Sequence, residues 1–74
     1  MFYKRTLRSL GKILKGKRYY LRYSQDYVAN EAHIARKHIS DLENGKTNPS
    51  LFLLLKLCSV YDAKLWIVLK EARM

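Results

Sequence analysis

The chain has 74 residues and a formal net charge of +9, from 15 Lys and Arg against 6 Asp and Glu. A chain of this length forms one domain with a modest core, and its charge favours a polyanion partner, first nucleic acid and second an anionic membrane. Cys58 is the only cysteine, which excludes an intrachain disulfide and fits a reducing cytoplasm. The longest apolar run, Leu51 to Leu55, is far too short for a membrane span, and we expect neither a signal peptide nor a membrane partner.

The N-terminal third carries most of the charge excess, because residues 1–23 hold eight basic residues and no acidic one. Apolar residues recur there at the spacing of an amphipathic helix, and they are Leu7, Leu10, Leu14 and Leu21. Gly11 and Gly16 are expected to weaken this helix by about 1 kcal/mol each. The helix therefore needs packing against the rest of the chain to persist.

The apolar seam of this first helix passes through Arg18, which places a guanidinium where the core should lie. Glu43 falls four residues after Ile39, on the inward face of a later helix. A buried charge is tolerated only when it is paired, so we predict an ion pair between Arg18 and Glu43. The alternative is that both are surface charges that never meet.

Residues 24–49 read as two short helices joined by a tight turn. Ser24 suits the cap of the first, which should end near Ala32, and Asn44-Gly45 suits the end of the second. The apolar positions of the two helices are Val28, Ala29, Ala32, Ile34, Ile39 and Leu42. Neither helix is long enough to be stable alone, so the two must share a core.

A further helix is predicted after the turn at Thr47 to Ser50, capped by Ser50 or Asn48. Its expected inner face consists of Leu51, Leu54, Leu55 and Cys58. Since Phe52, Leu53 and Leu57 make the helix apolar nearly all round, it is either a subunit or partner interface or a well-buried central helix. Cys58 is expected to be a buried core thiol.

The period of the pattern changes after Asp62, where apolar residues begin to alternate. This predicts a β-strand over Lys64 to Lys70, with a fifth helix as the alternative. An unpaired strand needs a partner, so we predict pairing across a dimer axis. The interface residues would be Leu65, Trp66, Ile67, Val68 and Leu69. This divides the chain into a helical domain over 1–62 and a dimerisation strand and tail over 63–74.

Residues from about Leu10 to Tyr61 resemble the helix-turn-helix family of the lambda repressor and Cro. The resemblance is carried by Leu10-Gly11 with Leu14 and Arg18, Ser24-Gln25 with Val28-Ala29, Ile34 with Ile39 and Leu42, and Glu43-Asn44-Gly45-Lys46 with Asn48-Pro49. His33 stands where the family has a turn glycine and would need a positive φ. Ala35 replaces the usual hydroxyl cap, at a cost of about 1 kcal/mol. The tail is similar to that of small antitoxins of the high-persistence type.

The resemblance implies that the helix beginning near Arg36 enters the major groove of DNA. Its base-reading residues would be Arg36, Lys37, Ser40 and Asp41, whose side chains can donate to guanine or accept from cytosine. Phosphate-binding residues would be Gln25, Asn44, Lys46 and Thr47. Without the motif, Arg36 and Lys37 would read as a solvated helix face.

Together these patterns predict a mainly α, four- to five-helix DNA-binding domain with a C-terminal β-strand. The expected function is a homodimeric repressor of a palindromic operator, namely an antitoxin that represses its own promoter and binds a toxin. A stand-alone or phage-type regulator is the alternative. A nucleic-acid binder without sequence choice would use the basic first helix and the aromatic cluster Tyr19, Tyr20, Tyr23 and Tyr27.

Several other kinds of site are not expected. The sequence shows no paired carboxylates, nucleophile with a base, or glycine-rich phosphate loop, so we expect neither an enzyme nor a cofactor. His33 and His38 are five residues apart and do not share a helix face, and Cys58 belongs to a different stripe, so a metal site is not expected.

Overall fold

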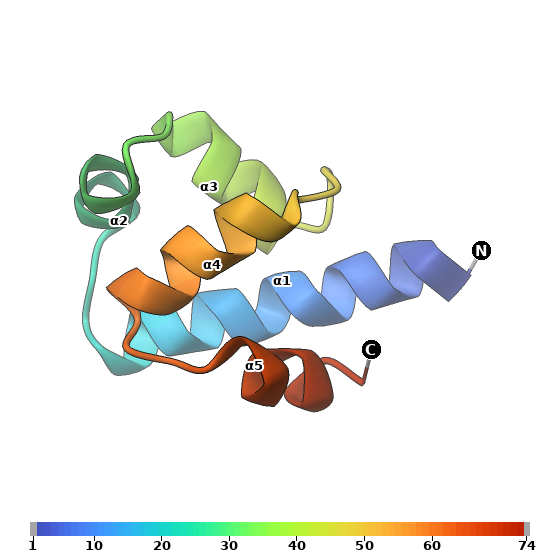
Figure 1. Ribbon diagram of the computed structural model, residues 1–74. Coiled ribbons are helices and arrows are strands. Elements are labelled where there is room, and N and C mark those ends of the chain that lie inside the picture. The colour runs from blue at the N-terminus through green and yellow to red at the C-terminus, as the bar shows by residue number, and fades with distance from the viewer. Residues whose placement is uncertain (1, 74) are drawn as a thin grey trace.

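The computed structural model describes residues 2–73 as five α-helices. They are α1 (Phe2–Tyr20), α2 (Gln25–Ala32), α3 (Arg36–Glu43), α4 (Leu51–Val60) and α5 (Leu65–Glu71). The long α1 crosses the whole molecule, with α2 and α3 on one side and α5 on the other (Figure 1). Helix α4 contacts both α2 and α5, which closes the bundle around one core.

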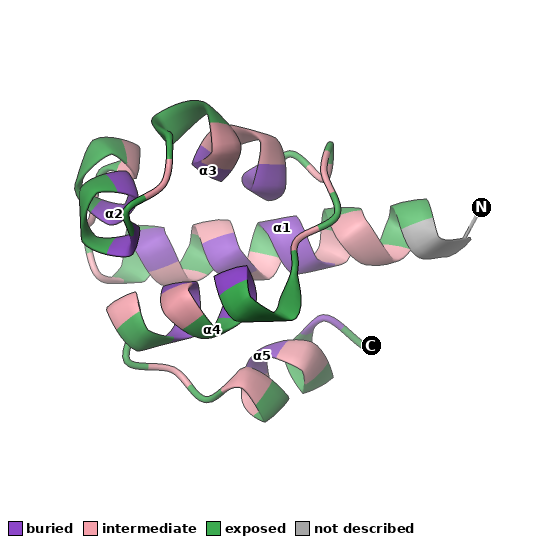
Figure 2. Cartoon of the chain, turned by 45° about the horizontal axis from the view of Figure 1, so that its top comes forward, coloured by how far each residue is buried: buried purple, intermediate pink, exposed green. Residues whose placement is uncertain are grey.

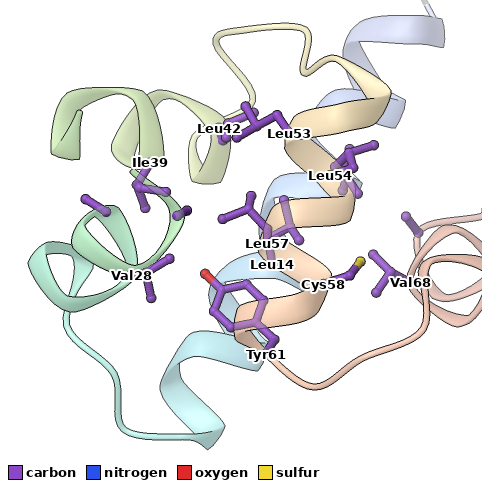
Figure 3. Close-up of a cluster of buried hydrophobic side chains, with 14 residues drawn as sticks. Leu14, Val28, Ile39, Leu42, Leu53, Leu54, Leu57, Cys58, Tyr61 and Val68 are labelled. Carbon is purple, nitrogen blue, oxygen red and sulfur yellow. The ribbon is translucent and has the colours of Figure 1, made fainter. Parts of the chain in front are cut away.

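Each helix supplies one of the five most deeply buried large side chains, namely Leu14, Val28, Ile39, Leu57 and Val68. These side chains converge between the helices in Figure 3. Helices of seven to ten residues, as four of the five are, are marginal in water on their own. The shared core therefore holds all five helices in place, and the angle between α2 and α3 is set by what lies beneath them.

The turn between α2 and α3 adopts the predicted strained geometry. His33 ends α2 with φ 57° and ψ 45°, in the left-handed region that the missing glycine would have occupied without cost. Ser24 caps the start of α2, where its side chain accepts a hydrogen bond from the backbone N–H of Tyr27. Ala35 precedes α3 and offers no side-chain cap, so the first N–H groups of α3 stay open to a partner.

The predicted strand over residues 64–70 is wrong, because Leu65–Glu71 forms helix α5. Val68 is fully buried and belongs to the chain's own core, so it cannot serve in an interface with a second copy. Leu65, Val68 and Ala72 follow each other at three and four residues, and this helical spacing turns all three toward the core. A helix satisfies its own backbone hydrogen bonds, whereas a lone strand would have left them unpaired.

The faces of α4 also differ from the prediction. Leu53 and Leu57 are buried with Leu54 and Cys58, whereas Leu51, Phe52 and Leu55 are exposed. The helix is thus neither wrapped on all sides nor left outside the core. It buries one face within the monomer and presents three large apolar side chains to the surface.

Candidate nucleic-acid interface

The structure brings Arg18 and Glu43 together in a buried, two-pronged ion pair. Arg18 Nε lies 2.6 Å from Glu43 Oε2, and Arg18 Nη2 lies 2.9 Å from Glu43 Oε1. The hydrogen bonds to Glu43 raise the pKa of the Arg18 guanidinium above its ordinary value, although burial opposes the rise. This geometry, in which two N–H groups meet both carboxylate oxygens, is the strong form of such a pair. It fixes the C-terminal end of α3 against α1.

Two further groups complete the network around this pair. Arg18 Nη1 donates to the Tyr23 carbonyl over 3.0 Å, and Gln25 Nε2 donates to Glu43 Oε1 over 3.1 Å. Gln25 was predicted to bind phosphate, and its side-chain amide is already used in the network. Its backbone N–H is at the first turn of α2, where helical N–H groups have no partner within the helix and favour an anion. The network thus ties α1, α3 and the start of α2 into one unit.

The four predicted base-reading residues lie along the outer side of α3. Arg36 and Lys37 are exposed, and Ser40 and Asp41 are half-buried. Lys37 Nζ lies 3.2 Å from Asp41 Oδ2, and Arg36 Nε lies 3.5 Å from Asp26 Oδ1 on α2. Exposed pairs of this kind are worth less than about 1 kcal/mol, so phosphate or base atoms could replace the carboxylates at little cost.

Polar groups flank α3 at both of its ends. Beyond its C-terminus, Asn44 and Lys46 are exposed and Thr47 is half-buried, and Gly45 takes a φ of 69° that bends the loop. Near its N-terminus lies a polar hollow of about 380 Å³ beside the start of α2. The exposed outer surfaces of α2 and of the start of α3 are seen in Figure 2. The helix therefore stands between two groups of side chains that can bind backbone phosphates.

The polar hollow contains two residues that the sequence analysis did not assign to the site. Lys15 and Tyr19, both on α1, line it together with Ser24, Gln25 and Arg36. Lys15 Nζ and the Arg18 guanidinium carbon lie 5.6 and 4.8 Å from the centre of the Tyr19 ring, which fits cation–π contacts. Helical spacing could have found Lys15, which stands one turn before Arg18 on the same helix.

The remaining chemistry-bearing residues lie away from this surface. Cys58 is buried, and desolvation raises the pKa of its thiol, which keeps it protonated and unreactive. Between residues 2 and 73, no three His, Cys, Asp or Glu side chains are grouped to hold a metal ion. Across the same residues, no helix combines the length and apolarity needed to cross a bilayer.

Comparison with known families and structures agrees with this geometry. The family model described as helix-turn-helix matches residues 21–65, well over half of the chain. The chain belongs to the helix-turn-helix family. The sequence resemblance to the lambda repressor and Cro type is thereby confirmed, whereas the resemblance of the tail to antitoxins finds no support. No curated protein sequence matches the chain significantly.

Solved structures share most of this fold. Two crystal structures of the clp gene regulator ClgR from Corynebacterium glutamicum align with TM-score 0.88 and 26% identity over 92% of this chain, and over 72% and 87% of theirs. The restriction-modification controller protein C.AhdI from Aeromonas hydrophila aligns with TM-score 0.81 and 27% identity, over 84% of this chain and 94% of its own. Most of the architecture of this chain is thus found in a clp gene regulator and in a restriction-modification controller protein.

Proposed function

We propose that the protein is a sequence-specific DNA-binding transcriptional repressor that binds a palindromic operator as a homodimer. The observation that carries the proposal is the outer side of α3. This helix is fixed from below by the Arg18–Glu43 pair, and it presents donors and acceptors on its exposed side. The similarity to a clp gene regulator and to a restriction-modification controller supports a regulatory role.

In this proposal Arg36 and Lys37 donate to guanine O6 and N7, Asp41 accepts from cytosine N4, and Ser40 does either. The N–H groups at the start of α2, with Asn44, Lys46 and Thr47, bind phosphates and set the position of α3 in the groove. The pairs of Arg36 with Asp26 and of Lys37 with Asp41 hold the long side chains over the surface until DNA replaces them.

Binding assays on two substitutions test the base-reading role. Arg36→Ala should cost about 1 to 3 kcal/mol on the operator and little on random duplex, because it removes base contacts. Lys46→Ala should weaken both complexes alike, because a phosphate contact carries no sequence information. Footprinting of the DNA upstream of the gene supplies the operator. An equal loss of affinity for operator and random duplex in Arg36→Ala would refute the base-reading assignment.

The homodimer is proposed to form through the exposed apolar side chains of α4 and α5. Leu51, Phe52 and Leu55 are 64%, 70% and 47% exposed, and Trp66 on the neighbouring α5 is 63% exposed. Large apolar side chains gathered on one helix face favour association, and a second copy of the chain is the partner that a palindromic operator requires. The α3 helices of the two copies must then lie about one DNA turn, or about 34 Å, apart.

The oligomeric state tests this interface. Phe52→Lys and Leu55→Lys together should give a monomer in sedimentation equilibrium and weaken operator binding, while the helix signal in circular dichroism stays. Tyr20→Lys is the matched control, because Tyr20 is an exposed aromatic on α1, 87% accessible and outside the proposed interface. A double variant that still sediments as a dimer would place the interface elsewhere.

We propose a stand-alone regulator rather than an antitoxin. The expected toxin partner depended on a strand over residues 64–70, and α5 occupies that segment. Affinity purification of the protein with the product of the neighbouring gene would decide between the two settings. Recovery of a stoichiometric partner would favour the antitoxin.

A further inference from the structure

Helix α1 carries a row of basic side chains that the proposed function does not use. The row, here called the α1 stripe, consists of Lys4, Arg5, Arg8, Lys12 and Lys15. With about 100° of rotation per residue, all five fall within an arc of about 100°. Lys15 is half-buried and the other four are exposed. The stripe is therefore a continuous positive face along most of the longest helix.

The charges of the α1 stripe are not balanced by the protein itself. Within residues 2–73, none of the five side chains forms a salt bridge, although Lys17 and Arg18 on the same helix pair with Glu71 and Glu43. The core face of α1, which carries Leu10 and Leu14, lies on the opposite side of the helix. Packing does not explain the stripe, because a helix needs no such row to bury its apolar face.

Two members of the α1 stripe, Arg8 and Lys15, adjoin the predicted phosphate-binding groups. In the middle of the stripe Arg8 packs against Gly45, where an added Cβ would come within 3.0 Å of Arg8 Cα and Cγ. Gly45 lies in the loop that bears Asn44 and Lys46, and Figure 1 places this loop beside the N-terminal half of α1. At the C-terminal end of the stripe Lys15 lines the polar hollow with Gln25 and Arg36. The stripe thus connects the two groups that flank α3.

We propose that the α1 stripe is a second phosphate-binding track, which holds the backbone of DNA beyond the base pairs that α3 reads. From Lys4 to Lys15 the helix rises about 16 Å, and one strand of DNA presents a phosphate for about every 3.4 Å of its axis. The track therefore spans about four or five phosphates. It adds affinity without sequence preference, because Lys and Arg side chains meet phosphate oxygens and release counterions. The inference rests on the proposed DNA-binding function.

The dependence of affinity on salt tests the track directly. The triple variant Lys4→Gln, Arg8→Gln, Lys12→Gln removes three charges and keeps the Cγ of residue 8 that touches Gly45. The probe is a duplex of random sequence and about 30 base pairs. A plot of the logarithm of the association constant against the logarithm of the salt concentration has a negative slope, and its magnitude should decrease by about 2 to 3 in this variant. Each phosphate that is no longer neutralised reduces that magnitude by about 0.9. Because the probe is random duplex, the result does not depend on finding the operator.

A matched variant separates the track from net charge alone. Lys56→Gln, Lys64→Gln, Lys70→Gln removes the same number of charges from α4, α5 and the segment between them, and it should leave the slope nearly unchanged. An unchanged slope in the stripe variant, or an equal loss in the matched variant, overturns the proposal. If the triple variant fails to fold, the single substitutions Arg8→Gln and Lys12→Gln should each reduce the magnitude of the slope by about 1.

Two further readouts distinguish the track from a failure of the proposed function and from a membrane-binding face. The stripe variant should prefer the operator over random duplex by the same factor as the parent protein. If the proposed function is wrong, the parent protein itself will show no preference for any operator. Flotation with phosphatidylserine vesicles tests a membrane partner. Loss of vesicle binding in the stripe variant together with an unchanged DNA slope would assign the stripe to lipid and overturn the track.

Discussion

Two glycines of α1 occupy opposite environments. A Cβ on Gly11 would come within 2.5 Å of the Leu42 carbonyl oxygen and 2.6 Å of the Glu43 carbonyl oxygen, whereas a Cβ on Gly16 would meet no atom within 4 Å. Sequence propensity treats both glycines as weak points of the helix. The structure shows that Gly11 lets α1 approach the end of α3, where the ion pair forms, and that Gly16 has no such role.

These environments predict opposite effects of the same substitution. Gly16→Ala should raise the free energy of unfolding by about 0.5 to 1 kcal/mol, because alanine restricts the unfolded chain and suits a helix interior. Gly11→Ala should lower it, because backbone oxygens cannot move away cheaply. Urea denaturation of both variants measures the difference. Stabilisation by both alanines would mean that α1 and α3 are not in close contact.

At the scale of the element, the sequence predicts some features well and others poorly. Two local features were predictable: Arg18 on an apolar seam needs an acid, and His33 at a glycine position needs a positive φ. The secondary structure of the tail was not predictable, because the same segment satisfies two patterns. Residues 64–70 alternate as in a strand, and Leu65, Val68 and Ala72 have helical spacing. Only the packing against α1 and α4 decides between them. Likewise, periodicity could not tell which face of the apolar α4 is buried.

Helix α5 is predicted to be part of the folding unit rather than an appendage. Val68→Ala should cost about 1 to 3 kcal/mol of stability, since it opens space in a fully buried position. Trp66→Ala, on the exposed face of the same helix, should leave the monomer's stability within about 0.5 kcal/mol. Thermal unfolding at concentrations where the protein is monomeric gives both values. Equal effects would indicate that α5 does not pack as described.

The ion pair between α1 and α3 is a second contact whose loss should be severe. Glu43→Ala leaves the Arg18 guanidinium buried without a carboxylate and should destabilise the protein by about 3 to 5 kcal/mol. The double variant Arg18→Met, Glu43→Leu should recover much of that loss, because no charge remains to be buried. Chemical denaturation measures all three proteins. A Glu43→Ala protein as stable as the parent would mean that the pair is solvated.

At the scale of the whole molecule, the core is small enough that one polar network and one buried phenol affect its stability. The Arg18–Glu43 network lies at the junction of α1, α2 and α3. Tyr61, which follows the last residue of α4, is buried and interacts electrostatically with both charges of the pair. A single-domain protein is stable by only about 5 to 15 kcal/mol, so the ionisation of a buried group matters to the entire fold. The buried ionisable groups should therefore determine how the free energy of unfolding falls at alkaline pH.

Burial raises the pKa of the Tyr61 phenol, the charge of Glu43 adds to the rise, and Arg18 opposes it. Desolvation likewise raises the pKa of the Cys58 thiol. Both groups hold their protons more tightly in the folded protein, so their contribution is complete below the unfolded pKa values, about 8.5 for Cys and 10 for Tyr, and is lost as pH rises above them. Stability should therefore fall from about pH 9 to 11, by up to about 1.4 kcal/mol per pH unit for each proton.

Tyr61→Phe should make this decline of stability with pH shallower, whereas Tyr20→Phe, which removes an exposed phenol, should not. Urea melts across this range measure the slopes, and identical slopes in Tyr61→Phe and the parent would show that the buried phenol does not control alkaline unfolding.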